Sequence, residues 1–108
     1  MAFDEALAAR VRDLVPAGAV EKKMFGGLAF LVGGHMAVAA SGRGGLMVRV
    51  EPGRTAELVA RPGVSRMVMG GREMDGWLRV DDEGVRTKRQ LEPWVRRGVA
   101  YARSLPPK

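Results

Sequence analysis

The side chains most able to do chemistry lie between residues 21 and 50. This stretch, EKKMFGGLAFLVGGHMAVAASGRGGLMVRV, carries Lys22 and Lys23 near its start, His35 in its middle, and four glycine clusters. Amines and imidazoles serve as nucleophiles and as acid–base catalysts, and glycine-rich loops cradle phosphates. The stretch is therefore either a loop that holds a phosphate or a set of tight turns between strands.

The glycine spacing favours turns. A Walker-type loop needs G-x-x-x-x-G-K followed by Ser or Thr, and no stretch of the sequence has that pattern. A dinucleotide fingerprint must open a helix, whereas Gly42-Arg43-Gly44 leads into the apolar alternation of a strand. Adjacent glycines suit primed hairpin turns, in which both central residues have positive φ. We predict such turns at Gly33-Gly34 and Gly70-Gly71, with Asp75-Gly76 as the alternative for the second.

Catalytic chemistry lacks the residues that would support it. His35 is the only histidine and cysteine is absent, so a catalytic triad would rest on one side chain beside a glycine turn. An activated amine at Lys22 or Lys23 would need desolvation, but Glu21 beside them favours a solvated position. The consecutive acids Asp81-Asp82-Glu83 lack the alternate spacing of a calcium loop and predict a polar connection. We expect no catalytic residue, cofactor or metal.

Size and composition predict one soluble domain spanning residues 1–108. This length buries a core without a staple, and the absence of cysteine excludes disulfides and thiolate metal sites. The longest apolar stretch, residues 28–40, is interrupted by Gly33, Gly34 and His35, so it is not a membrane span. The first residues mix acids and arginines, unlike a signal peptide. We expect a cytoplasmic protein without membrane contact.

The formal net charge of +6 is concentrated at the C-terminal end. From Gly84 to Lys108 there are seven basic residues and a single acid, Glu92, while residues 1–83 are neutral overall. Arg89, Arg96 and Arg103 fall seven apart and form one stripe along a helix. Their guanidinium groups would face nucleic-acid phosphates, an acidic partner or only water.

Periodicity and turn signals predict an α+β fold. A first helix, from Asp4 as N-cap to about Val15, carries an apolar stripe of Phe3, Leu7, Val11 and Leu14. The remaining elements are strands at 24–32, 35–41 and 46–50, a helix at 52–60, strands at 65–69 and 74–80, and a last helix ending near Ser104. An antiparallel sheet packed against helices follows from this order.

The last helix has two possible starts. Thr87 and Gln90 have capping-box spacing, whereas Pro93 would place the start near residue 92. Its apolar side consists of Leu91, Trp94, Val95, Ala102 and Leu105. The seven methionines of the chain either fill gaps between helix and sheet, which is the commoner use, or form an adaptable binding surface.

Four segments together resemble the N-terminal domain of the TfoX/Sxy family: KKMFGGLAFLVGGHMA, LMVRV, GREMDG and WVRRGVAYARSLPPK. The resemblance implies an α+β fold of the secretion-chaperone-like type, with helix, three strands, helix, two strands and helix. It also implies a setting in bacterial competence regulation, where longer members act as cofactors of a transcription activator. Those members add a helical C-terminal domain that has no counterpart in these 108 residues.

The resemblance transfers no catalytic residue. It marks motif positions of unknown role, namely Lys22, Lys23, Met24, Phe25, Gly26, Gly27 and Arg49. We therefore expect a non-enzymatic regulatory or binding module that acts through protein–protein contacts, as a homodimer or with another protein, using a strand edge or a sheet face. The second hypothesis is nucleic-acid binding through Arg89, Arg96 and Arg103. A small-ligand site or enzyme around Lys22, Lys23 and His35 is the third.

Overall fold

The computed structural model describes residues 4–24 and 26–107 and confirms the α+β class. Three α-helices, α1 (Glu5–Arg12), α2 (Thr55–Val59) and α3 (Lys88–Ser104), lie within the described residues. Six strands form one antiparallel sheet: β1 (Val20–Met24), β2 (Gly27–Val32), β3 (His35–Ala40), β4 (Leu46–Arg49), β5 (Val64–Met69) and β6 (Arg72–Val80). Two 3-10 turns, η1 (Pro52–Arg54) and η2 (Asp82–Val85), precede α2 and α3. The spatial order of the strands is β1-β2-β3-β4-β6-β5.

The predicted element order was one strand short. The expected strand at 24–32 corresponds to β2, and the prediction missed β1 before it. The two strands pair antiparallel from Val20 opposite Leu31 to Met24 opposite Gly27. All residues of β1 except Met24 are exposed. Because β1 has no buried face, its sequence lacks the alternation of apolar and polar residues by which a strand is predicted. This outer strand is held in place by its hydrogen bonds to β2 and not by the burial of apolar side chains.

The paired glycines form hairpin turns as predicted. Gly33 and Gly34 join β2 to β3 with φ of 61° and 83°, and neither leads into a helix. Gly70 and Gly71 join β5 to β6, so the alternative turn at Asp75-Gly76 was wrong and Gly76 lies inside β6. The backbone N–H of Gly76 instead donates to the hydroxyl of Thr55, over 2.7 Å.

The first helix is shorter than expected. Asp4 is its N-cap, and its carboxylate accepts from the N–H groups of Ala6 and Leu7. The helix ends at Arg12, three residues before the predicted end, and residues 13–15 form turns. Leu7 and Val11 of the predicted stripe are buried, while Phe3 lies outside the described residues.

The last helix begins at the capping box and not near residue 92. Thr87 accepts from the N–H of Gln90, whose side chain accepts from the N–H of Thr87. Pro93 is accommodated inside the helix. Leu91, Trp94, Val95 and Ala102 of the predicted apolar side are buried against the sheet.

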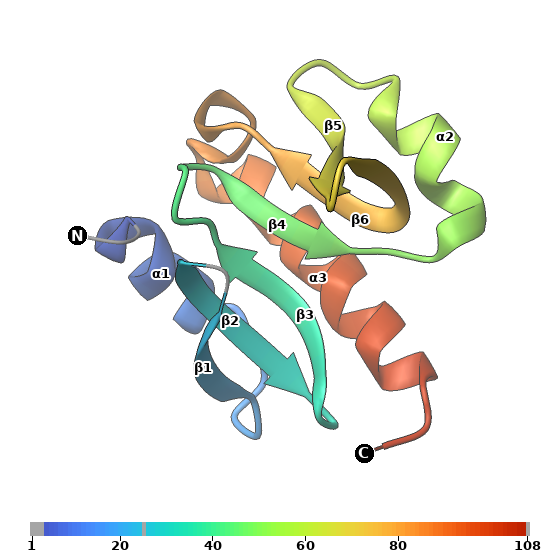
Figure 1. Ribbon diagram of the computed structural model, residues 1–108. Helices are drawn as coiled ribbons and strands as arrows, with labels where there is room; N and C mark the ends of the chain where they lie inside the picture. Colours follow the sequence, from blue (N-terminus) through green and yellow to red (C-terminus); the bar gives the residue numbers. More distant parts are fainter. Residues whose placement is uncertain (1–3, 25, 108) are drawn as a thin grey trace.

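The main core lies between the sheet and the helices. α1 and α3 lie on one side of the sheet (Figure 1), and their buried residues share a cluster with Phe30, Val38 and Val48 of the strands. Leu58 of α2 joins the same cluster. α3 lies so close to β3 that a Cβ on Gly98 would come within 2.3 Å of the carbonyl oxygen of Ala37. Only glycine permits this contact between the two backbones.

Candidate functional site

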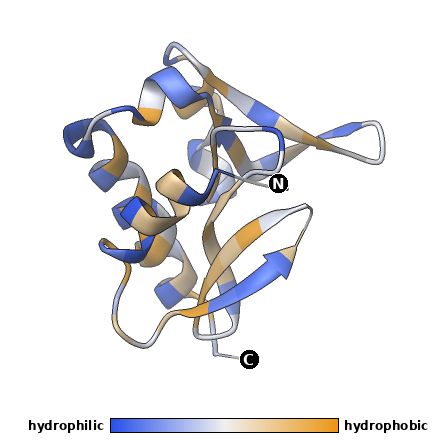
Figure 2. Cartoon of the chain, turned by 90° about the vertical axis from the view of Figure 1, so that its left-hand side faces the viewer, coloured by the Kyte–Doolittle hydropathy of each residue, from blue (hydrophilic) through white to orange (hydrophobic). Residues whose placement is uncertain are grey.

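The sheet face turned away from the helices carries a second apolar cluster. Its buried members are Ala29, Met36, Ala39 and Met47, and partly buried side chains pack against them: Met24, Leu31, Met67 and Trp77. All eight are strand residues, and no residue of a described helix belongs to the cluster. We call this surface the methionine face. In Figure 2 the helices lie to the left of the strands, and the edge hairpins extend to the right, away from them.

The strand register explains the composition of this face. Residues directly opposite each other on neighbouring strands share a face. Ala29 pairs with Ala39, Ala39 with Met47, and Met47 with Arg79, so one row runs across four strands. Met36 and Met47 are only 4% exposed. These methionines are buried as expected, but on the face opposite the helices and not between helix and sheet.

A polar groove borders the methionine face at the β5 side. Its volume is about 420 Å³, and its lining includes Met47, Met67, Arg43, Arg66 and Arg79. The Arg79 guanidinium donates to the carbonyl oxygens of Arg43 and Gly44, each over 2.9 Å, and so holds the 41–45 turn against β6. The guanidinium of Arg66 pairs with Asp75 at 2.9 Å. The groove is therefore lined by arginines, two of which are held by hydrogen bonds or an ion pair, and by the methionines Met47 and Met67.

The acidic connection after β6 has a structural role. A carboxylate oxygen of Asp82 accepts from the N–H of Gly45 over 2.8 Å, and Asp81 accepts from the N–H of Gly84. Within residues 4–24 and 26–107, no three acidic or histidine side chains are grouped as metal ligands. Asp82 thus connects this segment to the turn before β4, and Asp81 caps the 3-10 turn η2.

Lys22 and Lys23 do not converge on a common site. Lys22 lies opposite Ala29, on the methionine face, whereas Lys23 lies opposite Leu28, on the helix-covered face. His35 starts β3, and its Nε2–H donates to the carbonyl oxygen of Pro106 over 2.7 Å. The histidine thus ties the segment after α3 to the hairpin turn.

Comparison with known families finds a match over most of the chain. The family model described as the TfoX N-terminal domain matches residues 13–102, a span that contains all six strands and most of α3. The chain belongs to the TfoX N-terminal domain family. Neither the search of curated proteins nor that of solved structures finds a match.

In this TfoX N-terminal domain, the motif glycines have structural positions. Gly26 has a φ of 74° in the turn between β1 and β2. A Cβ on Gly27 would lie 2.1 Å from the carbonyl oxygen of Ala40, so this position requires the bare backbone. Phe25 lies outside the described residues. Gly26 thus permits the turn between β1 and β2, and Gly27 permits the close approach of β2 to β3.

The motif position Arg49 joins three elements of the domain. Its guanidinium carbon lies 4.8 Å from the ring centre of Trp77 on β6 and 5.5 Å from that of Tyr101 on α3. Both distances fit cation–π contacts. Arg49 therefore connects the methionine face with the C-terminal half of α3.

The arginine stripe predicted on α3 is solvent-facing. Arg89, Arg96 and Arg103 are all exposed, and Arg96 forms an i,i+4 pair with Glu92 at 3.5 Å. The sequence analysis missed a different group of arginines. Arg97 lies against Trp94, and Arg54 of η1 and Arg61, which follows α2, lie near Arg97. The signal available was the i,i+3 spacing of Trp94 and Arg97, which places both on one side of the helix.

None of the described helices has the length and apolar character needed to cross a bilayer.

Proposed function

We propose that this TfoX N-terminal domain is a non-enzymatic binding module that acts through protein–protein contacts, and that its first partner is a second copy of itself. The observation that supports the proposal most directly is the methionine face. Met36 and Met47 are buried in this face, and a partner would contact its partly buried side chains: Met24, Leu31, Met67 and Trp77. No described helix residue joins the cluster. Methionine adapts its shape to irregular surfaces, which suits a contact surface. The regulatory role that the family implies would be exercised through this contact.

The strand edges indicate which side of the face makes the contact. β1 and β5 are the two outer strands, and unpaired strand edges are templates for pairing with another chain. β1 carries Lys22 and Lys23, and lysine on an edge strand opposes edge-to-edge association. β5 exposes Val68, whose relative exposure is 63%, beside the polar groove. The proposed dimer therefore forms through the β5 edge and the adjoining part of the methionine face.

Sedimentation velocity over a concentration series tests this proposal. The wild-type chain is expected to dimerise reversibly, and Val68→Lys is expected to shift it to monomer. Val20→Lys is the matched control, because Val20 lies on the opposite edge with a similar exposure of 62%. A wild-type monomer at high micromolar concentration would refute the dimer. Loss of the dimer in Val20→Lys but not in Val68→Lys would refute the choice of surface.

Nucleic-acid binding is the second candidate, and the exposure of Arg89, Arg96 and Arg103 along α3 favours it. Such binding would weaken as salt rises, because each phosphate contact releases counterions. Replacing all three arginines by alanine is expected to reduce the slope of log affinity against log salt by about three. An absence of any gel shift at low salt would remove this candidate.

A further inference from the structure

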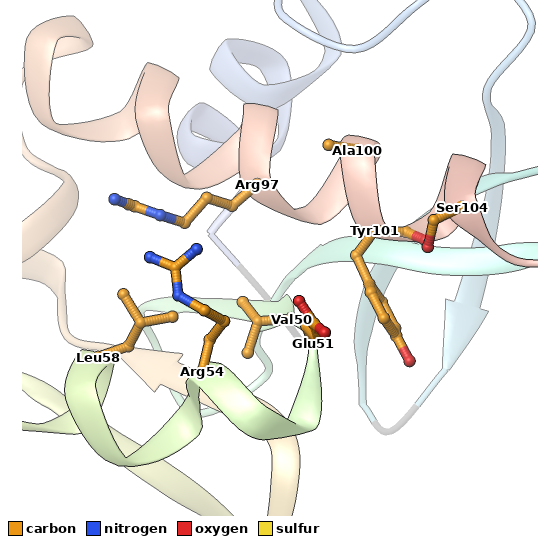
Figure 3. A pocket seen from close by; sticks show the side chains of 8 residues that line it. All are labelled: Val50, Glu51, Arg54, Leu58, Arg97, Ala100, Tyr101 and Ser104. Atoms are coloured by element: carbon orange, nitrogen blue, oxygen red, sulfur yellow. The ribbon is translucent and has the colours of Figure 1, made fainter.

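A separate pocket of about 270 Å³ opens between α3 and the η1–α2 segment (Figure 3). α3 contributes Arg97, Ala100 and Tyr101 to its walls, and the opposite wall includes Arg54 and Leu58. This volume lies just below the range of typical small-molecule sites, which begins at about 300 Å³, so the pocket would take a small ligand. The pocket is distinct from the groove beside the methionine face, with which it shares no lining residue.

Arg97 is the exceptional side chain in this pocket. Its Nη1 atom is buried and has no hydrogen-bond partner. Within the described part of the chain, none of the ion pairs joins Arg97 to a carboxylate. The guanidinium carbon lies 4.9 Å from the ring centre of Trp94, which fixes its position. Buried polar groups in folded proteins almost always have a partner, so a buried guanidinium nitrogen without one requires an explanation.

Two further arginines increase the positive charge next to Arg97. Burial lowers the pKa of the Arg97 guanidinium, and repulsion from Arg61 and from Arg54 lowers it further. Arg54 donates from Nε and Nη2 to Glu57, at 2.7 and 3.4 Å. In Figure 3 the guanidinium groups of Arg54 and Arg97 lie close to each other at the same end of the pocket. Three cations and the one carboxylate of Glu57 leave this end positive.

The other end of the pocket has a different character. Tyr101 and Glu51 line the pocket there (Figure 3). Val50, Leu58 and Ala100 add apolar surface to the pocket. A molecule with an anionic group toward Arg54 and Arg97 and a planar or apolar body would keep its charge away from the Glu51 carboxylate.

We propose that this pocket binds a small organic oxyanion, a phosphomonoester or a carboxylate, with its charged group between Arg54 and Arg97. The anion places negative charge between the two guanidinium groups and relieves the repulsion between like charges. Guanidinium groups bind planar and tetrahedral oxyanions through several parallel hydrogen bonds, so both anion classes fit. The ring of Tyr101 then contacts the body of the ligand.

Indole fluorescence gives a direct test. Trp94 and Trp77 are the only tryptophans, so Trp77→Phe leaves Trp94, which contacts Arg97, as the single reporter. The Trp77→Phe chain is titrated with phenyl phosphate, benzoate and inorganic phosphate. A saturable change with at least one of the two aromatic anions is expected, and the better of the two identifies the anion class. No saturable change with either one would overturn the proposal.

Two substitutions on α3 separate this site from general attraction to a basic helix. Arg97→Ala is expected to weaken binding by about tenfold or more. Arg96→Ala removes the same charge one residue earlier, at an exposed position outside the pocket, and is expected to leave the affinity unchanged. Equal weakening by both substitutions would overturn the proposal.

A third variant covers the case in which Arg97→Ala does not fold. Ala100→Glu places a carboxylate on the exposed pocket wall and is expected to abolish binding of the anions. Its control is Ala9→Glu at an exposed position of α1. Undiminished binding in Ala100→Glu would place the ligand elsewhere and refute the site. The dimer proposed above stands or falls independently, because its test uses Val20 and Val68 on the strand edges.

Discussion

The guanidinium carbon of Arg49 lies 4.8 Å from the centre of the Trp77 ring, and these two residues face each other across the β4–β6 ladder. The same guanidinium is 5.5 Å from the Tyr101 ring of α3. One motif position of the TfoX N-terminal domain family thus contacts aromatic rings on both a strand and a helix. The Arg49 guanidinium thus connects β6 to α3 through its contacts with the two rings.

Arg49→Ala is expected to lower the free energy of unfolding by about 1 kcal/mol, because it removes two partly buried cation–π contacts. Arg49→Lys keeps the charge and is expected to recover part of this loss. Urea unfolding followed by circular dichroism measures both. Arg72→Ala, at an exposed position on β6, is the control and is expected to change little. Equal stability of Arg49→Ala and wild type would contradict the connecting role.

Gly98→Ala is expected to destabilise the domain by about 1–3 kcal/mol, since the new methyl group would meet the carbonyl oxygen of Ala37 at 2.3 Å. α3 would have to move away from β3 to relieve this overlap. Gly53→Ala is the control, because nothing lies within 4 Å of a Cβ at that position. Thermal unfolding of the two variants measures the difference. A Gly98→Ala variant as stable as Gly53→Ala would show that α3 does not lie so close to the sheet.

Gly27→Ala tests the role of the motif glycines. A Cβ at this position would lie 2.1 Å from the carbonyl oxygen of Ala40, so β2 and β3 would have to separate locally. We expect a loss of about 1–3 kcal/mol in the free energy of unfolding. Gly18→Ala, where nothing lies within 4 Å, is expected to be tolerated. A stable Gly27→Ala chain would mean that the glycine serves something other than the close approach of β2 and β3.

The pair formed by Arg12 of α1 and Glu21 of β1 predicts a small pH dependence of stability. The hydrogen bond from Arg12 lowers the pKa of the Glu21 carboxyl below its usual value. A carboxyl with a lowered folded-state pKa contributes stability above its unfolded-state pKa, and this contribution is lost as the pH falls through the folded-state value. Both side chains are exposed, so solvent screening keeps the effect small.

Urea unfolding of the wild type and Glu21→Gln at a series of pH values measures this contribution. The wild type is expected to be slightly more stable at neutral pH, and the difference is expected to vanish once the pH has fallen below the lowered folded-state pKa of Glu21. Glu73→Gln, at an exposed position on β6, is the control. A difference that persists in acid would show that Glu21 acts through packing and not through its charge.

The helix-covered half of the fold could be predicted from the sequence with little error. α3 has a capping box and an apolar stripe of period 3.6, and both signals are local. The paired glycines at 33–34 and 70–71 likewise carry their own turn chemistry. β1 was not predicted because its sequence, VEKKM, shows no alternation of apolar and polar residues. It is a strand only because it pairs with β2.

The amino-acid sequence by itself determined the α+β class, the hairpin turns and the buried side of α3, because each depends on backbone preferences and spacing within a few residues. The tertiary structure alone decided that Met36 and Met47 lie on the face opposite the helices, because strand register assigns side chains to faces. It also brought Arg54 and Arg61 to Arg97, residues that are far apart in the chain. Charges interact according to their distance in space, and spacing along a sequence does not give that distance once the chain has folded.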